Sequence, residues 1–176
     1  MNNPEYILTD ELETIVTAVK IGLSLSALNY QYGTVEELNE TLQQLENDRD
    51  MYEGKFPLVW LPEPYTTDRG IVGIYGEANT DLFIINATEK TWKAPDRMTN
   101  NYKTVILPVY RRLLAEIVLS PVFDNNSVDT LKHSVTKGYY WDEQKKIFND
   151  AVDCLKISGL KLRINDKQDC TPTKSF

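Results

Sequence analysis

The chain has 176 residues, of which 41% are hydrophobic and 26% are charged, as expected for one soluble globular domain. Its formal net charge of −7, with acidic residues spread along the sequence, disfavours a protein that binds DNA by neutralising phosphates. No segment has the roughly 20 apolar residues of a membrane span, no secretory signal is evident, and two cysteines are too few for a disulfide framework.

The first predicted element is an amphipathic helix. Thr9 is expected to be its N-cap, because a threonine hydroxyl can accept a hydrogen bond from an amide of the first turn. The apolar residues that follow recur at three- and four-residue spacing; they are Leu12, Ile15, Val16, Val19 and Leu23. From Ala27 to Tyr32 apolar and polar residues alternate, which predicts a half-buried strand that ends at Gly33.

A second helix is predicted directly after that strand. Thr34 and Glu37 have the spacing of a capping box, in which each side chain bonds the backbone amide of the other residue. An apolar stripe follows, formed by Leu38, Leu42 and Leu45, and the helix is expected to end near Asn47. The run FPLVWL at 56–61 predicts a strand, with Pro57 at its start or on an unpaired side because proline has no amide hydrogen.

The middle of the chain begins with a segment rich in glycine, threonine and aspartate. This segment, 65–80, is predicted to form a long loop or a projecting β-hairpin. A strand is predicted over 81–88 and a loop over 91–97. A third amphipathic helix is expected to begin at Thr99 or Asn100.

Two prolines and one glycine are expected to bend or end the elements in the last third of the chain. Pro108 is expected to kink the third helix or to mark its true first turn, and Pro121 is expected to stop it. A strand is predicted over 131–141. The closing segment, 151–165, alternates in two halves around Ser158 and Gly159, which favours a tight hairpin or one bulged strand.

These elements predict the fold class. We expect an α+β fold in which a small mixed or antiparallel sheet packs with about three amphipathic helices. Residues 1–165 are expected to form a single domain, and 166–176 a polar C-terminal tail. Cys154 is expected to be a small core residue and Cys170 a free thiol.

No catalytic, cofactor-binding or metal-binding residue is predicted, and no cofactor. His133 is the only histidine, which excludes a His-based triad and a zinc site with several imidazoles, and it is expected at the surface or half-buried. The acidic residues at 36–40 are explained by the capping box and a solvated helix face. The glycines of DRGIVGIYGEAN (68–79) do not have the spacing of a phosphate-binding loop.

The aromatic residues are the main candidates for function. Tyrosine and tryptophan are favoured at protein interfaces. We therefore predict partner contact through five side chains, with core packing as the alternative for part of the set; they are Trp60, Tyr65, Trp92, Tyr139 and Trp141.

Three consecutive segments carry a resemblance to a known class of protein. They are the strand NYQYG (29–33), the capped helix TVEELNETLQQLEND (34–48) and the strand KFPLVWLPEP (55–64). With the elements around them, they resemble the neck ring proteins of tailed bacteriophages, of the tail-completion or head-to-tail adaptor type, including those of crAss-like phages. The likeness extends over most of residues 5–165.

The resemblance implies a non-enzymatic virion protein with a tail-completion-like fold. Such a protein would assemble in the host cytoplasm as a ring of about six or twelve copies between the portal and the neighbouring neck and tail proteins. DNA would pass through the lumen without specific binding, and no membrane would be involved. The 67–79 segment would be a natural site of subunit or neighbouring-ring contact.

Two other classes of function remain open. One is a small intracellular enzyme or ligand-binding domain that acts through the carboxylate-rich helix or His133, and it would need a deep pocket with convergent polar groups. The other is an acidic regulator that occupies a partner's basic surface. It is disfavoured because the acidic residues are dispersed over ordinary element faces.

Overall fold

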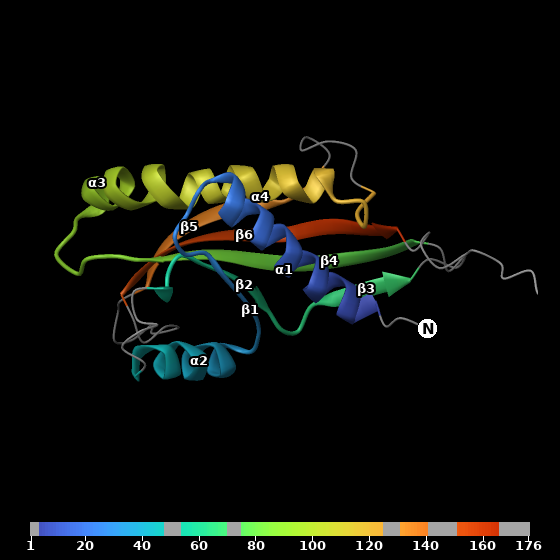
Figure 1. The fold of residues 1–176 in the computed structure, drawn as a ribbon, viewed down its shortest axis with the longest axis horizontal. Coiled ribbons are helices and arrows are strands. Elements are labelled where there is room, and N and C mark those ends of the chain that lie inside the picture. Colours follow the sequence, from blue (N-terminus) through green and yellow to red (C-terminus); the bar gives the residue numbers. More distant parts are fainter. Residues whose placement is uncertain (1–3, 48–53, 70–74, 125–130, 141–150, 166–176) are drawn as a thin grey trace, which may run out of the picture.

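A mixed β-sheet with helices on both faces forms the molecule (Figure 1). This computed structural model describes residues 4–47, 54–69, 75–124, 131–140 and 151–165. The strand order is β1-β2-β4-β6-β5, and β3 pairs with β4. Only β1 and β2 are parallel; the other described pairs are antiparallel. The predicted α+β fold with a mixed sheet is therefore confirmed.

Strands and helices occur in mixed order along the chain. The strands are β1 (Asn29–Gly33), β2 (Leu58–Pro62), β3 (Thr66–Arg69), β4 (Tyr75–Ala87), β5 (Ser134–Tyr140) and β6 (Val152–Asn165). The helices are α1 (Pro4–Gly22), α2 (Val35–Asn47), α3 (Ala94–Arg97), the π-helical segment η2 (Met98–Ile106) and α4 (Leu107–Leu119). Of the two predictions for 65–80, a long loop or a projecting hairpin, the structure has the hairpin pairing, between β3 and β4.

The sheet separates two hydrophobic cores. Helices α1 and α4 cover one face and α2 covers part of the other (Figure 1). Val59 and its neighbour Ile84 belong to the larger core, which α1 and α4 cover. The next pair along the same strands, Trp60 and Phe83, belongs to the smaller core under α2. Successive side chains of a strand point to opposite faces, so both faces of these central strands are apolar.

The first helix begins earlier than its sequence predicted. It starts at Pro4, so Thr9 lies inside the helix and the prediction that it is the N-cap is wrong. Leu8 is fully buried four residues before Leu12, so the apolar stripe continues toward the N-terminus. The stripe, rather than the threonine, determines how far the helix extends.

The long helix over 94–119 changes geometry before its proline. The predicted loop ends sooner than expected, because α3 already begins at Ala94. In η2 the Leu107 amide bonds the Tyr102 carbonyl, five residues back, and Pro108, which has no amide hydrogen, follows in the first turn of α4. Pro108 thus lies in the first turn of α4, but helical backbone already runs from Ala94 to this point, so it does not mark the start of the helix. The helix ends at Leu119, and Ser120 is already extended before Pro121, which confirms the predicted stop.

The closing segment is one bulged strand. Thr80 pairs with Leu160 and Leu82 pairs with Ile157, so Ser158 and Gly159 together stand opposite Asp81. Gly159 has a φ of 65°, as a glycine bulge requires, and its amide donates to the Asp81 carboxylate at 2.9 Å. The extra residue keeps the apolar side chains of both halves of β6 in the larger core. The bulged-strand prediction is confirmed and the hairpin alternative is wrong.

The bulge also predicts a dependence of stability on pH. Burial raises the pKa of Asp81, but hydrogen bonds from Lys156 and the Gly159 amide and the Lys156 charge lower it more, so the net shift is downward. The Lys156 Nζ lies 2.6 Å from the Asp81 carboxylate. A lowered folded-state pKa stabilises the fold above the unfolded-state pKa, and this stabilisation is lost as pH falls through the folded-state pKa.

Asp81→Asn should therefore lower the free energy of unfolding at pH 7 and have little effect in acid. Because the Asp81 side chain is 33% exposed, the loss should stay below about 1 kcal/mol. Urea unfolding of the wild type and the variant at about pH 7 and about pH 3 measures the difference. A difference that is equal at both pH values would contradict the explanation.

The predicted capping box is present at the start of α2. The Thr34 amide donates to Glu37 Oε2 at 2.8 Å, and the Glu37 amide donates to Thr34 Oγ1 at 3.3 Å. Gly33 precedes this box with a φ of 125°, which side-chain-bearing residues rarely adopt. A Cβ atom on Gly33 would lie 2.5 Å from Glu37 Oε2. The glycine thus makes room for the capping carboxylate.

Gly33→Ala is expected to lower the free energy of unfolding by about 1–3 kcal/mol, through backbone strain and loss of the cap. Gly54→Ala is the matched control, because no heavy atom lies within 4 Å of a Cβ placed there. Chemical denaturation of both variants tests this. Equal stability of the two variants would show that neither the strain nor the clash matters.

Candidate functional site

The described residues contain one buried polar cluster, where η2 crosses the paired ends of β4 and β6. Its centre is Asn101, which is 1% exposed. The Asn101 side-chain amide donates to Asp153 Oδ2 and to the Ala87 carbonyl, both at 2.9 Å. Its carbonyl oxygen accepts from Asn86 Nδ2 at 2.6 Å. Asn101 therefore connects the π-helical turn with both central strands.

A buried ion pair completes the cluster. Asp153 is fully buried, and its Oδ1 lies 3.3 Å from Arg97 Nε. Burial raises the pKa of Asp153, although the hydrogen bond from Asn101 and the charge of Arg97 partly oppose the rise. Arg97 Nη1 also donates to the Trp92 carbonyl at 2.7 Å. The guanidinium thereby joins the turn before α3 to the cluster.

Tyr102 extends the polar contacts to the edge of the sheet. Its hydroxyl lies 2.8 Å from the Gly138 carbonyl and 3.0 Å from the Cys154 carbonyl, so its proton is shared between β5 and β6. Burial, followed by the nearby charge of Asp153, raises the pKa of Tyr102. Burial likewise raises the pKa of Cys154, which is fully buried as predicted.

The cluster holds the helix on the sheet by bonds within the molecule. π-helical turns occur frequently at functional sites, which makes this the most site-like group in the described part of the chain. Its donors and acceptors are turned toward one another, and Asp153 and Asn101 are almost completely buried. Within the described ranges no three His, Cys, Asp or Glu residues are placed to hold a metal ion. Its evident chemical role is to fix the position of η2.

Sequence reasoning missed this cluster. Asn101 and Asp153 are 52 residues apart, and neither belongs to a motif. The available signals were an aspartate inside the apolar run AVDCLKI and a proline inside a helical pattern. A buried aspartate needs a partner, but the sequence does not indicate which residue provides it.

His133 is occupied by structural hydrogen bonds. It is half-buried, as expected, and lies one residue before β5. Its Nδ1 is 2.6 Å from the Leu131 carbonyl, which can only accept, so Nδ1 carries a proton. Its Nε2 is 2.7 Å from the Tyr110 hydroxyl. The histidine thus connects α4 to the start of β5.

The structure changes the set of predicted interface residues. Trp60 is 2% exposed, its Nε1 donates to the Gly33 carbonyl at 3.2 Å, and its ring centroid lies 5.0 Å from that of Phe83. It packs in the core under α2, so its prediction as an interface residue is wrong. The apolar partners on α2 explain this burial.

The other predicted interface residues lie nearer the surface or outside the described ranges. Tyr65 and Trp92 are half-buried. Tyr65 directly precedes β3, and Trp92 lies in the turn before α3 at the other end of the sheet (Figure 1). Tyr139 belongs to β5, but its side chain and the whole of Trp141 are outside the residues that the structure describes.

Both outer strands expose large side chains. Tyr32 on β1 is 58% exposed, and Val135 on β5 is 41% exposed. Among the described strands, β1 pairs only with β2, and β5 pairs only with β6. The sheet is therefore open along β1 and β5, on opposite sides of its strand order, and β3, which pairs only with β4 among the described strands, adds a shorter open edge.

Comparison with known proteins does not place the chain in a family. No family model matches it, and no curated protein is significantly similar to it. None of the described helices is long and apolar enough to cross a membrane.

Proposed function

We propose that the chain is a structural, non-enzymatic virion protein that forms a ring in the neck of a tailed bacteriophage. The ring joins the portal side to the tail side and lets DNA pass. The observation that supports this most is the open sheet with unlike edge strands, β1 and β5. A closed ring needs two different contact surfaces on each subunit, and an open sheet offers them.

The proposed copy number, partners and place of assembly are those expected of a phage neck ring protein. The ring has about six or twelve copies, contacts the portal and neighbouring neck or tail proteins, and is assembled in the host cytoplasm before it becomes part of the virion. The net charge of −7 suits a conduit that must not hold DNA tightly. No cofactor and no membrane are involved.

Native mass measurement tests the proposal directly. Native mass spectrometry or light scattering of the purified chain, alone and with its candidate portal partner, should show a discrete multimer in at least one condition. A strict monomer in both conditions would contradict the ring.

Tyr65 and Trp92 are the remaining predicted contacts with described side chains. Tyr65→Ala combined with Trp92→Ala is expected to weaken the multimer by at least about tenfold if both side chains lie at interfaces. The free energy of unfolding of the variant monomer is the control, because both residues are half-buried. Unchanged assembly would remove this pair from the proposal.

A small intracellular enzyme or ligand-binding domain is the second candidate. The observation in its favour is the π-helical turn over the Asp153–Arg97 pair. A ligand there would have to open the cluster and bond Asn101 or Asp153 in place of their present partners. A small molecule that raises the melting temperature of the wild type, but not of an Asn101→Ala variant, would support this candidate.

A further inference from the structure

We infer that neighbouring copies in the ring meet head to tail, through two oppositely charged edges of the sheet. The acidic edge consists of exposed carboxylates on either side of β1. The basic edge consists of exposed cations beside β5. This inference rests on the proposed ring, and it specifies which surfaces of the subunit form the contact.

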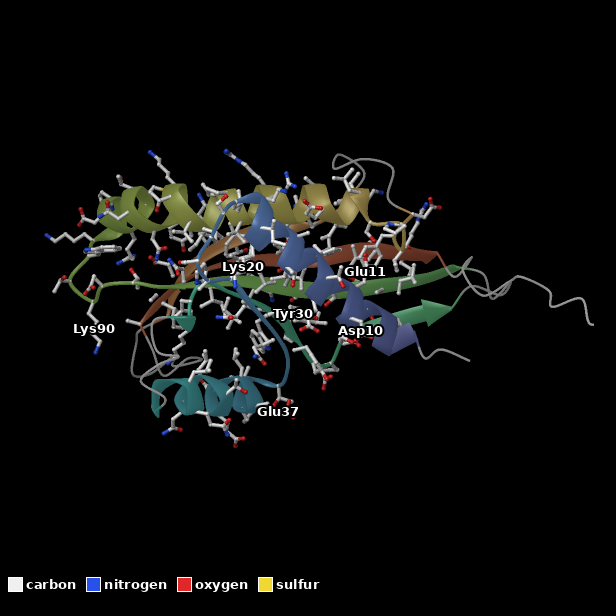
Figure 2. The ribbon with its side chains drawn as sticks, in the orientation of Figure 1. Asp10, Glu11, Lys20, Tyr30, Glu37 and Lys90 are labelled. Carbon is white, nitrogen blue, oxygen red and sulfur yellow. The ribbon has the colours of Figure 1, made fainter. Side chains whose placement is uncertain are left out.

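The acidic edge combines two helices that flank β1. Its carboxylates are Asp10 and Glu13 on α1 and Glu36, Glu37 and Glu40 on α2, all exposed. Figure 2 shows Asp10 on α1 and Glu37 on α2, on either side of Tyr30 of β1. The described lysines near this edge expose less of their side chains than the carboxylates do: Lys20 on α1 is half-buried, and Lys55 before β2 is 4% exposed.

Tyrosines lie among these carboxylates. Burial, and then the nearby groups of Tyr65, Glu13, Tyr32 and Asp10, raise the pKa of Tyr30. The Tyr30 hydroxyl is buried and has no hydrogen-bond partner among the described residues. Tyr32, two residues further along β1, exposes its ring. Aromatic rings beside carboxylates form a surface that suits arginine and lysine side chains.

The basic edge lies at the opposite side of the sheet. Its exposed cations are Lys103 and Arg111 on the long helix and Lys132 and Lys137 at β5. Two contacts place the helix beside β5: the Tyr102 hydroxyl reaches the Gly138 carbonyl, and the Tyr110 hydroxyl reaches His133. Lys103 and Arg111 directly follow these two tyrosines.

Among the residues that the structure describes, the acidic groups on this side do not neutralise the basic edge. Glu116 is paired with Arg112 on the same helix, and that guanidinium lies next to Gly22 of α1 rather than toward β5. Asp124 is exposed, but its amide bonds Arg163 at the far end of β6, beyond the part of β6 that pairs with β5. Val135, 41% exposed, adds apolar surface to the edge.

Charge complementarity indicates that each edge binds the opposite edge of a second copy of this chain, in head-to-tail orientation. A two-fold dimer through either edge would bring like charges together, which is unfavourable, whereas head-to-tail contact brings opposite charges together. Both surfaces are exposed, so their charges act mainly on orientation and association rate and are screened by salt. The contact should therefore weaken as ionic strength rises.

Charge reversal at each edge provides the test, measured as the native mass. One variant carries Glu13→Lys and Glu40→Lys, and spares the capping carboxylate of Glu37. The other carries Arg111→Glu and Lys132→Glu. Each variant alone is expected to associate at least about tenfold more weakly than the wild type. An equal mixture of the two is expected to form multimers again, because a copy with two basic edges can alternate with a copy with two acidic edges.

A matched control separates this contact from the effect of net charge. Lys90→Glu with Lys93→Glu changes the net charge as much as the basic-edge variant does, in the turn between β4 and α3 (Figure 2). Because Trp92 lies in the same turn, the control is read by mixing: the acidic-edge variant should form multimers with the basic-edge variant but should not be incorporated into multimers of this control. Salt is a second measurement that needs no variant: about 0.5 M NaCl should shift the wild-type multimer toward smaller species.

The outcomes distinguish the edge contact from the ring itself. If both edge variants form multimers as the wild type does, and the wild-type multimer also persists in high salt, the edge contact is overturned while the ring stays in place. A wild-type chain that is monomeric alone and with its portal partner would overturn both. Single-edge variants that dissociate, and that reassemble when mixed, would support the head-to-tail contact.

Discussion

Asn101→Ala is expected to lower the free energy of unfolding by about 3 kcal/mol. The substitution removes few atoms, but it takes a hydrogen-bond partner from three groups: a buried oxygen of the Asp153 carboxylate and, part-buried, the Ala87 carbonyl and the Asn86 amide. A buried polar group that loses its hydrogen bond incurs the desolvation cost without compensation, and the cost is larger for a charged group. Urea or guanidinium unfolding measures the change.

The adjacent residue provides the control for this experiment. Asn100 is exposed on the same helix, so Asn100→Ala makes the same chemical change outside the cluster. It should alter the free energy of unfolding by less than about 0.5 kcal/mol. If both variants lose the same amount, the loss reflects helix propensity, and the buried cluster does not fasten η2 to the sheet.

Trp60→Ala is expected to be the most destabilising single change considered, at about 3–5 kcal/mol. The substitution empties a site between α2 and the sheet that Phe83, Leu38 and Leu42 surround, and it removes the hydrogen bond to the Gly33 carbonyl. That carbonyl lies immediately before the capping box, so the start of α2 should be weakened together with the small core.

Trp92→Ala is the matched tryptophan, because its side chain is half-buried in a turn. It should cost much less stability, and its larger effect should be on assembly. Thermal unfolding of the monomer and native mass measured on the same samples would separate these two effects. A Trp60→Ala variant as stable as Trp92→Ala would mean that the core under α2 contributes little to folding.

Local signals in the sequence predicted most of the fold. The α2 capping box depends on residues three apart, and the stop before Pro121 depends on a single residue, so neither needs knowledge of the rest of the molecule. The bulge at Gly159 was one of two alternatives from its own segment. Only the partner strand decided between them, because Asp81 supplies the acceptor for the extra amide.

The features that sequence reasoning missed depend on distant contacts. Trp60 was predicted to contact a partner because tryptophan is favoured at interfaces, but a helix that precedes it in the chain covers it. The polar cluster joins Asn101 to Asp153 across 52 residues. The opposite charges of the two edges arise because β1 and β5 end up at opposite sides of the sheet. Each of these depends on topology, which periodicity does not specify.

The position of β6 has a consequence for how the chain reaches its fold. β6 is the last of the described strands, yet it lies between β4 and β5 in the sheet. During synthesis, the edge of β4 that pairs with β6 therefore stays unpaired until β6 emerges from the ribosome. Over the same interval β5 has no strand partner. An unpaired edge is a template for pairing with another chain, so nascent chains crowded on one message are most at risk of misassembly in this interval. Because pairing β4 with β6 also closes a long loop, completion of the sheet should be the slow step of folding.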